Sequence, residues 1–340
     1  MQVLITGAAG YIGSHAVQRL LRDGHHVVAL DNLSRGHREA IERLDAVSEG
    51  RLTFVECDAG DRARVLGTLR EHGVKTVMHF AAFALVGESV ERPLAYYVNN
   101  TAASAGLLSA CAEAGVERFV FSSTCATYGE PGEIPIRETC PQRPVNPYGR
   151  SKLYVEQMLA DHAEARRLAS KPFSYAALRY FNVAGCDRTG MLGEDHDPET
   201  HLIPVILQAM LGKRDRVTIF GTDYPTADGT CIRDYVHVED LIDAHVTVMD
   251  ALEPGDERRY NLGIGKGLSV REIIDAAARV VGRGVPVVEG DRRAGDPPAL
   301  YSDPSKIRAE LGWSASITDV DEIIDSAWRW FQAHPDGYGR

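Results

Sequence analysis

Short apolar runs alternate with amphipathic stretches through the first half of the chain. The apolar runs have the length of strands and fall at residues 3–5, 26–30, 52–56, 76–80, 118–122 and 174–180. Helical patterns separate them at residues 12–23, 61–72, 93–114 and 148–169. Near-continuous apolar strands that alternate with helices predict an α/β fold with a doubly wound parallel sheet over residues 1–180.

The regular alternation ends near residue 180. Residues 182–235 are rich in Gly, Pro, Asp and Thr, and a loop-rich segment of this length is usually functional. The later patterns predict helices near 202–212, 239–252, 269–281 and 319–333 and a strand at 259–262. Because 340 residues exceed one ordinary core, we expect residues 181–340 to form mostly a smaller α/β domain for substrate, with some segments returning to the first domain.

Composition and charge narrow the class of protein. Apolar residues make up 44% of the chain and charged residues 25%, as in soluble globular proteins. The net charge of −11, with no dense Lys/Arg run, argues against a nucleic-acid partner. The most apolar stretch, residues 74–87, is too short to span a membrane and contains Lys75 and His79. The six cysteines form no C-x-x-C pair, so we expect a cytoplasmic protein without a metal site, disulfides, signal peptide or membrane span.

A glycine-rich turn follows the first predicted strand. Gly7, Gly10 and Gly13 open a helix, as in Rossmann-like dinucleotide-binding folds, where the helix N-terminus attracts a pyrophosphate. Asp31 ends the second strand 18 residues after Gly13. A carboxylate at this place can bind ribose hydroxyls and repels a 2′-phosphate, so the sequence favours NAD over NADP. Asp58 ends the third strand and could reach the adenine, although an isolated aspartate more often caps a helix.

Tyr148 and Lys152 are four residues apart and therefore share one face of a predicted helix. Free tyrosine titrates near pH 10, and a nearby ammonium favours its phenolate form, which can take a proton from a sugar hydroxyl. Thr124 ends the fifth strand, where its hydroxyl could hydrogen-bond the reacting oxygen. These residues predict proton abstraction from an alcohol coupled to hydride transfer to NAD.

Longer motifs extend over nearly the whole chain, and with them the chain resembles the extended short-chain dehydrogenase/reductase superfamily and, more narrowly, its UDP-glucose 4-epimerase family. They include Phe121-Ser-Ser-Thr-Cys-Ala-Thr-Tyr-Gly129, Asn146-Pro-Tyr-Gly-Arg-Ser-Lys152, Arg179-Tyr-Phe-Asn182, Gly229-Thr-Cys-Ile-Arg-Asp-Tyr235 and Tyr260-Asn-Leu-Gly263. The resemblance implies transient oxidation of C4 by a tightly bound NAD that is regenerated in each turnover. It also implies a homodimer formed through helices near 93–114 and 148–169.

The resemblance further assigns roles to individual residues. It implies that Tyr148 is the base, that Lys152 lowers its pKa and binds the nicotinamide ribose, and that Thr124 assists at the sugar O4. It implies an NAD site lined by Gly7, Gly10, Tyr11, Ile12, Gly13, Asp31, Asn32, Ser34, Arg35, Gly36, Asp58, Ala59, Phe80, Ala81, Ala82, Ala84, Asn99, Ser122, Tyr148, Lys152 and Phe181. It implies a UDP-sugar site lined by Thr124, Tyr148, Asn182, His201, Leu202, Thr218, Ile219, Phe220, Arg233, Arg293, Asp296 and Leu300.

Two other activities have less support in the sequence. Sugar-nucleotide dehydratases of the same superfamily place two acidic residues after the threonine, whereas Cys125 and Ala126 follow Thr124 here. A non-catalytic NAD-binding regulator would not need the Tyr148–Lys152 pair.

The identity of the sugar stays open at this point. Glucose and galactose are favoured, and UDP-glucuronate, UDP-N-acetylglucosamine and a UDP-pentose are the alternatives. Leu300 leaves room for an N-acetyl group where some relatives carry tyrosine, and Ala84 stands where others carry lysine. Arg188 is the candidate cation for the carboxylate of a glucuronate.

Overall fold

The computed structural model describes residues 1–293 and 296–339, which form two compact units. The first unit comprises residues 1–129, 141–179 and 242–260. The second unit comprises residues 130–140, 180–241 and the described part of 261–340. The chain therefore passes from one unit to the other at several points.

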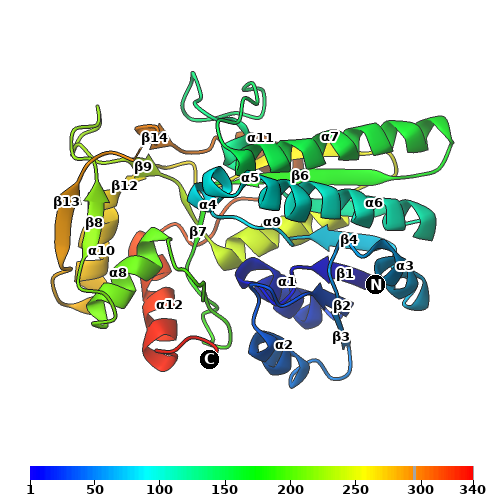
Figure 1. Ribbon diagram of the computed structural model, residues 1–340, viewed down its shortest axis with the longest axis horizontal. Coiled ribbons are helices and arrows are strands. Elements are labelled where there is room, and N and C mark those ends of the chain that lie inside the picture. The colour runs from blue at the N-terminus through cyan, green and yellow to red at the C-terminus, as the bar shows by residue number, and fades with distance from the viewer. Residues whose placement is uncertain (294–295, 340) are drawn as a thin grey trace. The chain divides into compact units, whose positions relative to one another are not determined.

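A seven-stranded sheet forms the centre of the first unit (Figure 1). Its order is β11-β6-β5-β4-β1-β2-β3, with bounds β1 (Gln2–Thr6), β2 (His26–Asp31), β3 (Leu52–Glu56), β4 (Thr76–His79), β5 (Arg118–Ser122), β6 (Ser174–Tyr180) and β11 (Glu257–Leu262). In the spatial order β6-β5-β4-β1-β2-β3, every strand pairs in parallel with its neighbours. The strand order reverses between β1 and β4, the place where doubly wound sheets bind ligands. The prediction of a doubly wound α/β sheet is thus confirmed.

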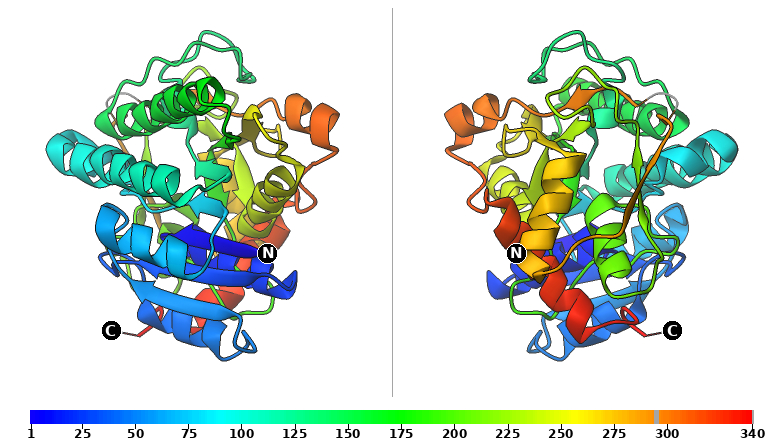
Figure 2. Two further views of the ribbon diagram at one scale, coloured as in Figure 1. Left: turned by 90° about the vertical axis from the view of Figure 1, so that its right-hand side faces the viewer. Right: turned by 90° about the vertical axis from the view of Figure 1, so that its left-hand side faces the viewer.

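Helices cover both faces of this sheet (Figure 2). On one face, α3 (Arg62–Glu71), α6 (Ala103–Ala114) and α7 (Pro147–Leu168) bury apolar side chains, among them Leu69, Leu107 and Leu159, against strand residues such as Phe119. On the other face lie α1 (Tyr11–Arg22), with α2 (Arg38–Asp45) beside it, and α9 (Val238–Ala251). The near-continuous apolar strands follow from this arrangement, because a sheet covered on both sides has no solvated face.

The prediction of one regular helix at 93–114 was wrong in its first part, where the structure is not a continuous α-helix. The structure has α4 (Val86–Glu91), α5 (Pro93–Tyr96), a π-helical turn η1 (Tyr97–Ala102) and then α6. The wide turn contains Asn100, whose side chain accepts a hydrogen bond from the Phe83 amide (2.8 Å) and donates one to the Phe83 carbonyl (3.0 Å). Single π-turns inside helices are frequent at functional sites.

The second unit contains three small sheets and a group of helices. Its strand pairs are β7 (Asn182–Ala184) with β10 (Tyr235–His237), β8 (Val217–Phe220) with β13 (Val287–Gly290), and β9 (Ile232–Arg233) with β12 (Leu268–Ser269) and β14 (Ala299–Leu300). Its helices include α8 (Leu202–Met210), α10 (Val270–Val281), α11 (Ser305–Leu311) and α12 (Val320–Ala333). Ser269 and Glu272 form a reciprocal capping box at the start of α10, so the predicted helix at 269–281 begins one residue later.

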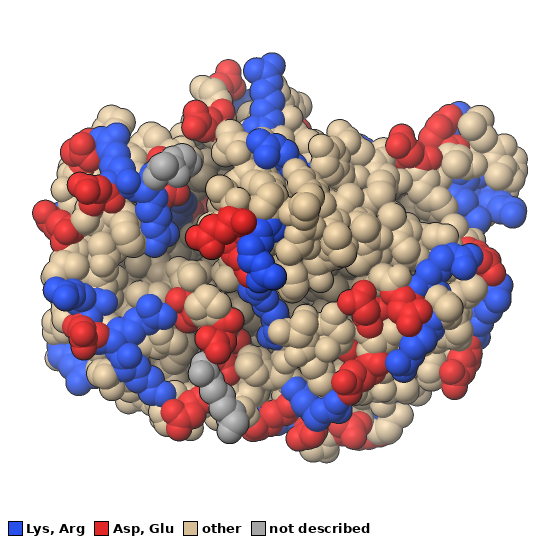
Figure 3. All heavy atoms as spheres, in the orientation of Figure 1, with Lys and Arg blue, Asp and Glu red and all other residues tan. Residues whose placement is uncertain are grey.

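Acidic and basic side chains are interspersed on the face seen in Figure 3. Many arginines there and elsewhere pair with carboxylates, as Arg292 does with Asp223 at 2.6 Å. Among the residues that the structure describes, no helix is both long and apolar enough to cross a membrane.

Candidate active site

The first two turns of α7 present Tyr148 and Lys152. The Asn146 side chain caps the helix by accepting the Gly149 amide at 2.8 Å, and Pro147 occupies the first helical position, where its missing N–H costs nothing. Tyr148 is 7% exposed and Lys152 is 3% exposed. A start fixed by both a cap and a proline places the two side chains one turn apart on the same helix face.

Lys152 is a buried cation with a single described acceptor. Its Nζ donates to the Ser122 carbonyl at 2.8 Å and lies 5.0 Å from the ring centre of Phe121. Burial lowers the pKa of Lys152 to about 7, and only the negative charge of Glu156 opposes this effect. The Lys152 side chain therefore lies at the carboxyl end of β5, where loss of hydration makes its positive charge unfavourable.

Glu156 belongs to a buried network that the sequence did not reveal. Arg179 donates to both of its oxygens, at 3.0 Å from Nε and 2.6 Å from a terminal nitrogen, and also donates to the Tyr128 hydroxyl at 2.8 Å. The Ser123 hydroxyl donates to Glu156 at 2.5 Å. This network ties α7 to β6 and to the loop after β5, so it fixes the helix that carries Tyr148 and Lys152.

His79, at the end of β4, is a second buried group that sequence reasoning missed. The Thr6 hydroxyl lies 2.6 Å from its Nδ1, and the Ser104 hydroxyl lies 2.8 Å from its Nε2. Burial, and after it the charge of Lys152, lowers the pKa of His79 to about 3. The imidazole is therefore neutral at pH 7 and joins β1, β4 and α6 as a structural connector.

Thr124 does not end β5 but lies two residues beyond it, since the strand ends at Ser122, and it is 6% exposed. Its hydroxyl oxygen accepts the Ala126 amide at 3.1 Å and caps the short helical turn η2 (Cys125–Thr127). A hydroxyl that accepts a hydrogen bond still has its own proton to donate. This geometry leaves Thr124 able to donate to an oxygen of a bound molecule.

The glycine turn between β1 and α1 is shaped by close backbone contacts. Gly7 has φ +71°, and a Cβ there would lie 2.6 Å from the Ala81 nitrogen. A Cβ on Gly13 would lie 2.0 Å from the Gly7 carbonyl oxygen. Gly10 precedes α1 without a capping side chain, and the first turn contains no acidic residue. The first-turn amides, which have no acceptor inside a helix, are thus suited to an anion such as a pyrophosphate.

Asp31 ends β2 beside this turn. Its Oδ2 accepts the Ala9 amide at 3.0 Å and its Oδ1 accepts the Leu33 amide at 2.8 Å. Burial raises the pKa of Asp31, while these amides oppose the rise. The neighbouring Asn32 side chain donates to Asp58 at 2.8 Å. Asp58 does not cap α3, because the capping residue is Asp61. The turn and the two carboxylates at the strand ends have the donor and acceptor pattern that fits a dinucleotide with free ribose hydroxyls.

The predicted cofactor residues fall almost entirely in one unit. All except Phe181 belong to the first unit. The loop with Ser34 and Gly36 returns to the glycine turn, since the His37 amide donates to the Ala9 carbonyl at 2.9 Å. Arg35 donates to both oxygens of Glu88 at 2.7 Å and lies 4.5 Å from the ring centre of Phe83.

The predicted UDP-sugar residues, except Thr124 and Tyr148, belong to the second unit. Arg293 lies over the ring of Phe220, with 3.9 Å between the guanidinium carbon and the ring centre. Arg233 donates to the Pro297 carbonyl at 3.0 Å and lies 3.6 Å from Asp296. Strand pairing sets Leu300 beside Arg233. The unit therefore brings two arginines and an aromatic ring close to residues 296–300, an arrangement suited to a diphosphate and a flat base.

His201 immediately precedes α8, with Leu202 as the first helical residue. Its Nδ1 lies 2.7 Å from Glu194 and 3.4 Å from Glu199. Burial alone would lower the pKa of His201, but the two carboxylates outweigh it and raise the pKa to about 10. Glu194 and Glu199 were not among the predicted site residues.

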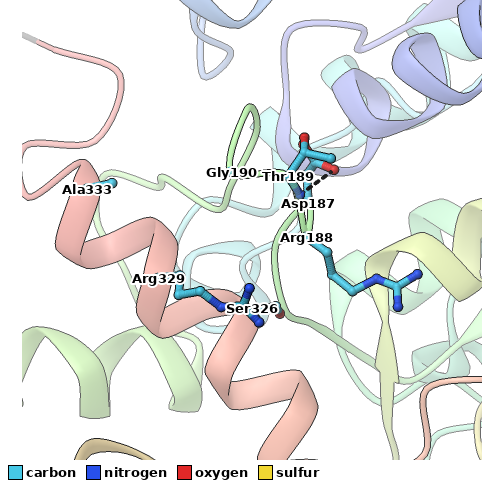
Figure 4. A pocket seen from close by; sticks show the side chains of 7 residues that line it. All are labelled: Asp187, Arg188, Thr189, Gly190, Ser326, Arg329 and Ala333. Carbon is cyan, nitrogen blue, oxygen red and sulfur yellow. Dashed lines mark hydrogen bonds between the residues drawn. The ribbon is translucent and has the colours of Figure 1, made fainter.

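Arg188 lies in the loop after β7, near Ser326 and Arg329 of α12 (Figure 4). Its Nε donates to Glu239 at 2.8 Å, and its guanidinium also reaches Glu322 at 3.5 Å. Two carboxylates therefore already neutralise the one cation that the sequence suggested for a glucuronate.

Comparison with known proteins defines the family. Residues 3–263 match the NAD dependent epimerase/dehydratase family, and the chain belongs to it. The UDP-glucose 4-epimerase of Halalkalibacterium halodurans is 46% identical over 339 residues, which cover 99% of this chain and 98% of the relative. A probable UDP-arabinose 4-epimerase of Oryza sativa is also 46% identical, over 99% of this chain and 84% of its own.

A solved structure gives the same result at the level of the fold. UDP-glucose 4-epimerase from Stenotrophomonas maltophila, crystallised with NAD and formylated UDP-arabinopyranose, superposes with a TM-score of 0.92 at 40% identity. The alignment covers 98% of this chain and 99% of that one.

Proposed function

We propose that this enzyme is an isomerase that inverts C4 of a UDP-sugar, with UDP-glucose and UDP-galactose as the substrate pair and NAD as the cofactor. The observation that carries the proposal is the buried Lys152 one helical turn from Tyr148 on α7. The relatives support it, since one is named for UDP-glucose 4-epimerisation and the solved neighbour holds NAD.

The first unit supplies the groups that we assign to NAD. The amides of the glycine turn and the start of α1 would hold the pyrophosphate, and Asp31 would hold the ribose hydroxyls. When bound, NAD supplies hydride chemistry at C4, taking up a hydride and returning it. Lys152 would contact the nicotinamide ribose, as the family resemblance implies.

Proton transfer is the part of the reaction that we assign to the chain's own residues. Tyr148, as phenolate, removes the proton from O4 of the sugar, and the Lys152 ammonium stabilises the phenolate. Thr124 donates a hydrogen bond to the same oxygen. After the 4-keto sugar has turned to present its other face, Tyr148 returns the proton to O4.

A sugar can turn within a site only if the nucleotide stays anchored. Arg233 and Arg293 have the planar donor groups that pair well with phosphate oxygens, and Phe220 offers an aromatic face. We assign these three residues, with Asn182, Thr218 and Asp296, to the UDP part of the substrate. Binding energy from the nucleotide then leaves the hexose free to rotate.

The alternatives differ in how well the described residues support them. The rice relative makes a UDP-pentose the second pair to test. UDP-N-acetylglucosamine stays an alternative because Leu300 is smaller than the tyrosine that some relatives carry there. UDP-glucuronate has less support, because Arg188 is already paired with Glu239 and Glu322. Dehydration has no support, because Cys125 and Ala126 carry no carboxylate that could act on C5 and C6.

The test is turnover of four UDP-sugars without added cofactor. Purified enzyme is incubated separately with UDP-glucose, UDP-glucuronate, UDP-N-acetylglucosamine and UDP-xylose, and the 4-epimers are resolved by chromatography. We expect UDP-glucose to react fastest. Faster turnover of another sugar would move the substrate assignment to it, and no turnover of any would contradict the proposed reaction.

We also propose a homodimer and a cytoplasmic location. Val90, Leu94 and Val98 recur every four residues across α4, α5 and η1 and are 62%, 76% and 67% exposed. Tyr154 of α7, 43% exposed, lies beside this stripe with its ring 6.1 Å from that of Tyr97. Exposed apolar stripes of this kind mark protein contacts. The six cysteines form no disulfide in the part of the chain that the structure describes, as a reducing compartment favours.

Light scattering tests the dimer. We expect the mass of two chains for the wild type and of one chain for Leu94→Lys, whereas the exposed-site control Val47→Lys, on a different surface, should remain dimeric. A single-chain mass for the wild type would contradict the proposal.

A further inference from the structure

Four metal-ligating side chains meet in the segment that leads into α8. They are Glu194, His196, Glu199 and His201, and one potential ligand atom from each lies within 4.8 Å of the others. The side chains of Glu194 and Glu199 are only 3% and 2% exposed, while those of His196 and His201 are 28% and 46% exposed. The cluster is thus a nearly closed group with its imidazoles toward the more accessible side.

The distances have the size that a shared ion requires. His196 Nδ1 lies 3.3 Å from Glu194 and 3.4 Å from Glu199. His201 Nδ1 lies 2.7 Å and 3.4 Å from the same two carboxylates. A tetrahedral zinc ion with bonds of about 2.0–2.1 Å holds its ligand atoms roughly 3.3–3.4 Å apart. Both distances from His196 Nδ1 match this spacing. His201 Nδ1 lies about 0.6 Å closer to Glu194 than the spacing requires, and its 3.4 Å distance is to Oε1 of Glu199.

Two carboxylate oxygens in the cluster are buried without a hydrogen bond. They are Oε1 of Glu194 and Oε2 of Glu199, and both lie close to imidazole nitrogens. Buried carboxylates are costly unless a positive charge and directed contacts satisfy them. Protonated His196 and His201, whose pKa values the carboxylates raise, supply that charge in the metal-free protein. A divalent cation would displace their protons, neutralise both carboxylates and accept lone pairs from all four side chains.

The surrounding groups hold the ligands in place. The second oxygen of Glu199 accepts the amides of Thr200 at 2.7 Å and His201 at 2.8 Å, which leaves Oε2 for another partner. Arg214 donates to the Glu199 carbonyl at 2.8 Å and thereby fixes the backbone of this residue. Outer contacts of this kind orient the ligands of metal sites.

We propose that Glu194, His196, Glu199 and His201 bind one divalent transition-metal ion, with zinc as the ion that fits two imidazoles and two carboxylates best. The cysteine pattern gave no sign of such a site, because none of its ligands is a thiolate. The ion ties the loop of residues 194–201 to the start of α8. It also fixes the ring of His201 through Nδ1 and leaves Nε2 as a donor. This last role rests on the proposed function, in which His201 lines the UDP-sugar site.

Metal content tests the site independently of activity. The NAD-containing enzyme, purified without a metal-affinity tag, is dialysed against metal-free buffer, titrated with zinc chloride and analysed by calorimetry and elemental analysis. We expect about one zinc ion per chain in the wild type, and at least about tenfold weaker binding for Glu194→Gln and for His196→Asn. The control His72→Asn changes a partly exposed histidine outside the cluster and should bind like the wild type.

Thermal unfolding gives the second readout. Zinc should raise the unfolding midpoint of the wild type and of His72→Asn, but not that of Glu194→Gln. Wild-type enzyme that binds no zinc and shows no shift would overturn the proposal and leave an ion-pair cluster of imidazoles and carboxylates. Because this measurement uses no UDP-sugar, its failure is distinct from failure of the proposed reaction.

Discussion

Replacing Lys152 by methionine should stabilise the fold while it removes activity. Burial lowers the pKa of Lys152 to about 7, from about 10.4 for a free lysine, a difference of roughly 3.5 pKa units. At about 1.36 kcal/mol for each unit, the buried lysine costs about 4 kcal/mol of unfolding free energy at pH 7 relative to an uncharged side chain. Loss of the hydrogen bond to the Ser122 carbonyl offsets about 1–3 kcal/mol of this, so a net gain of about 2 kcal/mol is expected.

The gain should depend on pH in a defined direction. Because the pKa of Lys152 is lower in the folded state, the unfolded chain binds more protons between about pH 7 and pH 10. The unfolding free energy of the wild type therefore rises with pH in this range. The variant Lys152→Met lacks this titrating group, so its unfolding free energy does not rise for this reason. The difference in unfolding free energy between Lys152→Met and the wild type should shrink by about 3 kcal/mol between pH 7 and pH 9.5.

Urea unfolding of NAD-free protein measures this difference without a contribution from bound cofactor. Lys171→Met, at an exposed position, is the matched control and should differ little from the wild type at any pH. Turnover of Lys152→Met should fall by about 10²–10⁴, the usual contribution of acid–base catalysis. A variant that is less stable than the wild type at pH 7, with a difference that does not vary with pH, would refute the reasoning.

Two further substitutions test other parts of the site. Asp31→Ala should reduce the preference for NAD over NADP, because no carboxylate would then repel the 2′-phosphate; an unchanged ratio of the two dissociation constants would exclude Asp31 as the ribose ligand. Glu156→Gln should lower the unfolding free energy by about 3–5 kcal/mol, since it leaves the Arg179 charge buried and unpaired. A loss below about 1 kcal/mol in denaturant titrations would show that the buried pair does not hold α7 in place.

The sheet could be predicted because its strands and long helices are marked by continuous local patterns. The strands at 52–56, 118–122 and 174–180 were predicted with the bounds that the structure has. The short helices α2, α4 and α11 and the two-residue strands were not predicted, because so few residues carry no clear period. The π-turn at η1 depends on the bond between Asn100 and Phe83, 17 residues away, which no local pattern shows.

The same distinction applies to the site. Tyr148 and Lys152 could be found because four residues separate them on one helix. The Glu156–Arg179 pair joins α7 to β6 across 23 residues, and nothing in the local sequence links the two. The cluster at residues 194–201 did leave a signal, two Glu and two His within eight residues, but a search for metal sites by cysteine spacing passes over it.

The most direct test of the central claim is the fate of the hydrogen at C4. UDP-glucose deuterated at C4 is converted to UDP-galactose by the wild type in ordinary water, without added NAD, and the product is analysed by mass spectrometry and NMR. Oxidation and return at the same carbon predict that deuterium stays at C4, and that Tyr148→Phe loses most turnover under the same conditions. Loss of the deuterium to solvent, or wild-type turnover by Tyr148→Phe, would contradict the account.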